Sequence, residues 1–74
     1  MPPLPVISGQ EAVRAFQKAG WRIARRESSH IVLIKAGAAA NLSVPDHHTL
    51  DRGLLRKLIR AAGLSVDAFN TLLG

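Results

Sequence analysis

Apolar residues recur at helical spacing in two stretches of the chain. In the first, Ser8-Gly9-Gln10-Glu11 forms a capping box, in which the Ser8 hydroxyl accepts the Glu11 amide and the Glu11 carboxylate reaches back. This pattern predicts a helix through about Ala19, which Gly20 ends because glycine readily adopts the left-handed conformation. Its apolar stripe consists of Ala12, Val13, Phe16 and Ala19.

The second helical stretch covers about residues 52–62, with Asp51 as its predicted N-cap and Gly63 at its end. Its apolar stripe consists of Leu54, Leu55, Leu58, Ile59 and Ala62. Ser65 then caps a short last helix, which carries Asp67 in its first turn.

Between the helices the apolar pattern changes to the alternation that is typical of strands. Residues 21–26 predict a half-buried strand with a basic outer face. Its faces are Trp21 and Ile23 on one side, and Arg22, Ala24 and Arg26 on the other. A tight turn at Glu27-Ser28 indicates an antiparallel hairpin with the next strand.

The second strand is expected from about Ser29 to Lys35 and is apolar on both faces, Ile31 and Leu33 on one and Val32 and Ile34 on the other. So small a domain has little material to cover two faces, so the second apolar face is a candidate partner surface. The alternative is that loops or the proline-rich beginning of the chain fold over it. After a flexible loop at 36–40, residues 41–44 predict a third strand that Pro45 ends.

These elements predict one α+β domain over residues 1–74, with the order αβββα followed by a short C-terminal helix. We expect a three-stranded antiparallel sheet with the helices on one face. Residues 1–7 are predicted to be an extended, loosely held proline-rich lead.

The charge points to an acidic partner. Ten Lys and Arg residues, seven of them arginines, face five Asp and Glu residues. The planar fork of arginine suits phosphate, which favours nucleic acid or an acidic protein as the partner, the alternative being a merely solvated basic surface.

Composition also excludes several classes of protein. The chain has no cysteine, which excludes disulfides and thiolate zinc sites. A chain of 74 residues has no room for a large cofactor cleft. The sequence shows neither a signal peptide nor an apolar stretch of about 20 residues, so we expect a cytoplasmic protein.

The strongest candidate for chemistry is His30, in Ser28-Ser29-His30 at the root of the central strand. Histidine exchanges a proton near neutral pH, and a strand root holds it rigidly. The alternative is a structural histidine that caps the strand. Asp46-His47-His48 with His30 lack a recognised ligand spacing, so no metal site is expected.

An ordered set of short motifs resembles the HicA-type toxins, the small mRNA-cleaving partners of type II toxin–antitoxin pairs. The resemblance runs from about residue 6 to residue 73. The motifs are Ile7-Ser8-Gly9, Ala19-Gly20-Trp21, Ser29-His30, Val44-Pro45-Asp46-His47, Gly53-Leu54-Leu55-Arg56-Lys57-Leu58-Ile59 and Ala62-Gly63-Leu64-Ser65.

The resemblance implies a double-stranded-RNA-binding-like αβββα fold with the catalytic histidine in a Gly-Ser-His motif, which is met by His30. Ser28 stands where the family usually has glycine. If that glycine serves a turn with positive φ, serine is tolerated with some strain; if it admits the RNA backbone, activity or substrate preference differs. The family's Val-Pro-x-His segment is met by His47.

The resemblance further implies a metal-independent endoribonuclease without a cofactor, acting on mRNA and neutralised by an acidic HicB-type antitoxin that covers His30. His30 is the expected general acid or base, with His47, or alternatively His48, as the second proton carrier. The candidate RNA-binding residues, each of which could instead be simply solvated, are Arg22, Arg26, Lys35, Arg52, Arg56 and Lys57. The rival reading is a non-catalytic RNA-binding module of the same fold.

Overall fold

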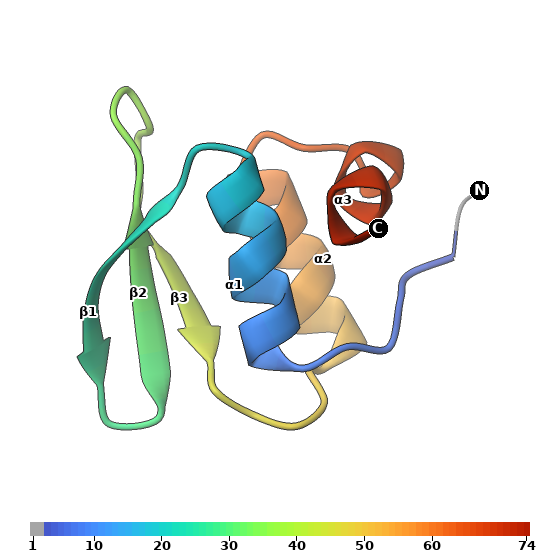
Figure 1. Ribbon diagram of the computed structural model, residues 1–74, viewed down its shortest axis with the longest axis horizontal. Helices are drawn as coiled ribbons and strands as arrows, with labels where there is room; N and C mark the ends of the chain where they lie inside the picture. Colours follow the sequence, from blue (N-terminus) through green and yellow to red (C-terminus); the bar gives the residue numbers. More distant parts are fainter. Residues whose placement is uncertain (1–2) are drawn as a thin grey trace.

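The computed structural model describes residues 3–74 and confirms the α+β class (Figure 1). The described residues form α1 (Gly9–Lys18), β1 (Arg22–Glu27), β2 (His30–Ile34), β3 (Leu42–Pro45), α2 (Arg52–Ala61) and α3 (Val66–Leu73). The bounds predicted for the first two helices and for the three strands each lie within one residue of those in the structure. No helix within residues 3–74 is long and apolar enough to cross a membrane.

The sheet is antiparallel with the order β1-β2-β3. Helices α1 and α2 lie on one of its faces, and α3 packs against these two helices on the side away from the sheet (Figure 1). On that covered face, Ile31 and Leu33 of β2 pair with Val44 and Leu42 of β3, and all four are buried in the core. On the other, open face lie the alternate residues of β2, which are His30, Val32 and Ile34.

The proline-rich lead runs on the helix side of the sheet and does not fold over the open face (Figure 1). Val32 on that face is nevertheless buried, at 6% exposed, and Ile34 is half-buried, so the open face is less apolar toward solvent than the sequence predicts. Leu4 and Ile7 belong to the hydrophobic core, and the carbonyl oxygen of Pro3 accepts a hydrogen bond from the Asn70 side chain of α3 at 3.2 Å. The expectation of a loosely held lead is therefore wrong for residues 3–7, because two of its apolar side chains fill the core. The Phe16 and Phe69 rings, 5.1 Å apart, join α1 to α3 in the same core.

The expectation of a half-buried β1 with strict alternation is also wrong. All six residues of β1 are exposed, and the buried Trp21 lies just before the strand. The register shifts between Ile23 and Arg25, which leaves Ala24 without a partner on β2. This bulge moves Arg26 to the covered face, on the side of Ile23.

The start of α1 is held against the end of β3. The amide of Gly9 donates to the carbonyl oxygen of His47 at 2.9 Å, and the amide of Leu50 donates to the carbonyl oxygen of Ile7 at 2.8 Å. A Cβ atom at Gly9 would overlap the carbonyl oxygen of Pro45. Only glycine therefore allows this approach of helix and strand.

The predicted capping box is present at the same place. The Ser8 hydroxyl accepts from the Glu11 amide at 3.1 Å, and the Glu11 carboxylate accepts from the Ser8 amide at 3.0 Å. The pKa of the Glu11 carboxyl is lowered, chiefly by the hydrogen bond from the Ser8 backbone and to a smaller extent by the one with the Ser8 hydroxyl.

We predict that Gly9→Ala lowers the free energy of unfolding by about 1–3 kcal/mol, because the added methyl group forces the helix away from Pro45. Urea unfolding at neutral pH measures this change. Gly53→Ala is the control, since a Cβ atom there meets only the Asp51 side chain at 3.2 Å. Equal effects of the two substitutions would contradict the proposed close contact.

We predict that Glu11→Gln destabilises the chain more at neutral pH than in acid. Because the pKa of Glu11 is lowered on folding, its stabilising contribution is full above the ordinary value of 4.5 and is lost as the pH falls through the folded value. Urea titrations of both chains between about pH 7 and pH 3 should show the difference shrink on acidification. A difference that does not depend on pH would refute this assignment.

Candidate functional site

A two-residue turn, Ser28-Ser29, sets His30 at the first position of β2. His30 has a cross-strand partner on each neighbouring strand, which is Glu27 on β1 and Pro45 on β3. His30 therefore sits on the central strand between two paired neighbours, with its imidazole exposed on the open face. A paired strand root fixes the backbone of this residue.

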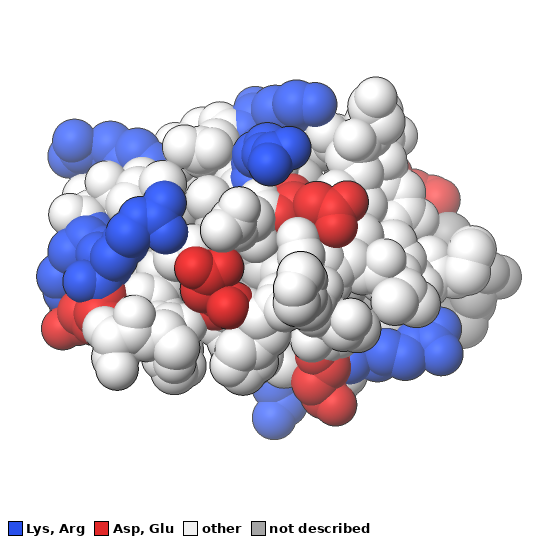
Figure 2. All heavy atoms as spheres, turned by 60° about the horizontal axis from the view of Figure 1, so that its bottom comes forward, with Lys and Arg blue, Asp and Glu red and all other residues white. Residues whose placement is uncertain are grey.

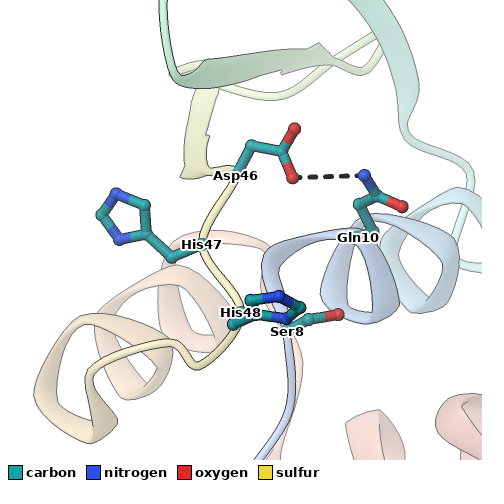
Figure 3. A pocket seen from close by; sticks show the side chains of 5 residues that line it. All are labelled: Ser8, Gln10, Asp46, His47 and His48. Atoms are coloured by element: carbon teal, nitrogen blue, oxygen red, sulfur yellow. Dashed lines mark hydrogen bonds between the residues drawn. The ribbon is translucent and has the colours of Figure 1, made fainter.

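The segment after β3 lies beside the same turn. The Asp46 amide donates to the carbonyl oxygen of Ser29 at 2.7 Å, and the Asp46 carboxylate accepts from the Gln10 side chain of α1 at 3.3 Å (Figure 3). A hollow of about 320 Å³ is lined here by Ser8, Gln10, Asp46, His47 and His48.

The two neighbouring histidines point in opposite directions. Figure 3 shows the His48 side chain beside Ser8 at the start of α1, whereas the His47 side chain points away from α1. Asp46 also faces α1, since its carboxylate accepts from Gln10, so His47 is the one of these three consecutive residues that points away from this helix.

Two of the candidate basic residues lie far from His30. Arg22 is the partner of Ile34, four residues along β2, which corresponds to about 13 Å. Lys35 follows β2 at that same distant end, where its side chain lies over Gly20. The structure does not bring these two residues to His30.

Arg26 is close to the turn but lies on the covered face. It is the cross-strand partner of Ile31 and lines a hollow beside α1 together with Gln10 and Arg14. The expectation that it shares a face with Arg22 is wrong, because the bulge at Ala24 separates them.

The remaining candidates are exposed on α2: Arg52 is its first residue, and Arg56 and Lys57 lie in its middle. This helix begins at the end of the molecule that also holds the hairpin turn (Figure 1). Figure 2 shows this end: basic side chains gather at its left margin, where Figure 1 places the β1–β2 hairpin, and acidic and uncharged groups separate them from the other basic side chains.

Arg25 is a basic residue of the open face that sequence reasoning missed. It is the partner of Val32, and its Nε atom lies 3.1 Å from the Glu27 carboxylate. The apolar alternation of Trp21 and Ile23 in the sequence does not indicate the bulge that turns Arg25 to the open face. Within residues 3–74, no group of three or more His, Asp or Glu side chains is arranged to hold a metal ion.

The fold and the site together describe a small basic α+β domain with an exposed histidine at the root of its central strand. Comparison with protein families matches residues 9–64 to the HicA toxin of bacterial toxin–antitoxin systems. The match covers more than half of the chain, which therefore belongs to the HicA toxin family. It is accordingly a toxin of a toxin–antitoxin system, with an antitoxin as its partner. No curated protein matches the chain.

Ser28, at the place of the usual family glycine, adopts a φ of +55°. It is the one non-glycine residue with positive φ in the part of the chain that the structure describes. Glycine is favoured at the first position of such a two-residue hairpin turn because a Cβ atom is strained there. Of the two explanations for the family glycine, the turn conformation is thus the one with a structural basis in this chain.

We predict that Ser28→Gly raises the free energy of unfolding by about 0.5–1 kcal/mol, the relief of left-handed strain less the entropy that glycine loses on folding. Thermal and urea unfolding measure it. Ser29→Gly is the matched control: its φ is not positive, so the same change should destabilise the chain. Stabilisation by both substitutions, or by neither, would argue against strain at Ser28.

Proposed function

We propose that this toxin is a metal-independent endoribonuclease that cleaves mRNA with His30 as general acid or base. The observation that carries the proposal is the position of His30, exposed on the open face at a paired strand root. An extended RNA strand can lie across such a face, whereas the covered face is closed by the helices (Figure 1).

RNA carries its own nucleophile, so few protein groups are needed. A base beside the 2′-hydroxyl removes its proton, the oxygen attacks the adjacent phosphorus, and the bond from phosphorus to the 5′-oxygen breaks. The products are a 2′,3′-cyclic phosphate and a 5′-hydroxyl, which takes up a proton from an acid. His30 acts at one of these two protons.

His47 is the better candidate for the other proton. Its side chain points away from α1, whereas His48 lies beside Ser8 at the start of that helix (Figure 3). Arg52, at the start of α2, and Arg56 and Lys57, further along the same helix, are proposed to hold RNA phosphates.

The antitoxin is proposed to be of the HicB type and to cover the open face around His30. That face exposes part of Ile34 beside the arginines of β1, and the net charge of the chain is +5. An acidic partner would associate rapidly with such a surface and exclude RNA from it.

We predict that His30→Ala lowers the rate of RNA cleavage by at least about 100-fold, because it removes the general acid or base. The measurement is cleavage of a defined single-stranded RNA in EDTA by the purified chain and its variant. His47→Ala should also slow cleavage, while His48→Ala, the matched control on the adjacent residue, should retain most of the activity.

Cleavage that needs a divalent metal, or that is equal in the wild type and His30→Ala, would overturn the assignment. Binding of RNA without cleavage by the folded wild type would favour the rival function, a non-catalytic RNA-binding module.

A further inference from the structure

The bulge in β1 places two consecutive arginines on opposite faces of the sheet. Arg25 is the partner of Val32 on the open face, and Arg26 is the partner of Ile31 on the covered face. The extra residue between Ile23 and Arg25 causes this separation. Bulges beside functional sites commonly redirect a side chain in this way.

Glu27 holds the Arg25 guanidinium from one side. The Nε atom of Arg25 lies 3.1 Å from a Glu27 carboxylate oxygen, and the two side chains are 55% and 58% exposed. An ion pair that is this exposed adds little to the stability of the fold. Its main effect is to orient the Arg25 guanidinium, with the Nε edge toward Glu27. With Nε engaged, the two terminal nitrogens form a fork whose geometry matches a phosphate group.

His30 lies next to this pair, since it is the direct cross-strand partner of Glu27. Arg25 is its diagonal neighbour on the open face, at roughly 7–8 Å between Cα atoms. We infer that Arg25 binds a backbone phosphate of single-stranded RNA beside the group on which His30 acts, with Glu27 as the residue that positions it. This inference rests on the proposed function and names a substrate contact for it.

The test is binding of a short single-stranded RNA that is 2′-O-methylated at every residue, which removes the nucleophile and prevents cleavage. Fluorescence anisotropy at several salt concentrations gives the affinity and its salt dependence. Arg25→Ala should weaken binding about tenfold and should reduce the logarithmic salt slope by about 0.7, the value for one phosphate contact on a single strand.

Arg26→Ala is the matched control, because it removes the same charge from the adjacent residue. Arg26 was a candidate RNA-binding residue by sequence, but it lies on the covered face and therefore outside the RNA path proposed over the open face. This substitution should weaken binding by less than about twofold if the contact is specific. Arg25→Lys should keep the salt slope but recover only part of the affinity, since lysine lacks the planar fork. Thermal unfolding of each variant verifies that its fold is intact.

Equal losses for the two alanine variants would show a general charge effect and would overturn the inference, as would undiminished binding by Arg25→Ala or no binding by the wild type. The cleavage assay is separate. If Arg25 supports binding as expected but the wild type cleaves no RNA, the phosphate contact stands and the nuclease proposal fails.

Discussion

The arrangement of this domain depends on the close approach of the first turn of α1 to the end of β3. Gly9 lies against the Pro45 carbonyl without a side chain between them, and its amide is bonded to the carbonyl oxygen of His47. The bond from Asp46 to Ser29 ties the same segment to the hairpin turn. Three parts of the chain that are distant in sequence are thereby joined at one end of the molecule.

The central strand divides the domain into a side covered by helices and an open side. Ile31 and Leu33 are at most 1% exposed beneath the helices, while His30 stands on the opposite face. A chain of 74 residues can build one core and one layer over its sheet. The face that remains open has the rigid support of that core, which suits it to holding a catalytic group and to binding a partner.

Strand β1 serves as a protected edge of the sheet and as the source of its basic margin. Four of its six residues are charged, and the bulge interrupts its regular hydrogen-bonding pattern. Both features oppose pairing with a strand of another molecule. The same bulge turns Arg25 toward the open face, so one local irregularity both guards the edge and changes the charge beside His30.

The sequence by itself determined the helices, the hairpin and the position of His30 at a strand root. These features follow from local signals, namely the capping box at Ser8 and Glu11, the apolar stripes and the short turn. The tertiary structure alone decided the burial of Leu4 and Ile7, the faces of Arg25 and Arg26, and the distance of Arg22 and Lys35 from His30. It also decided that His48 lies beside Ser8 and that His47 points away from α1. Each of these features depends either on contacts between distant segments or on one extra residue in a strand. Neither kind of cause produces a periodic pattern in the sequence.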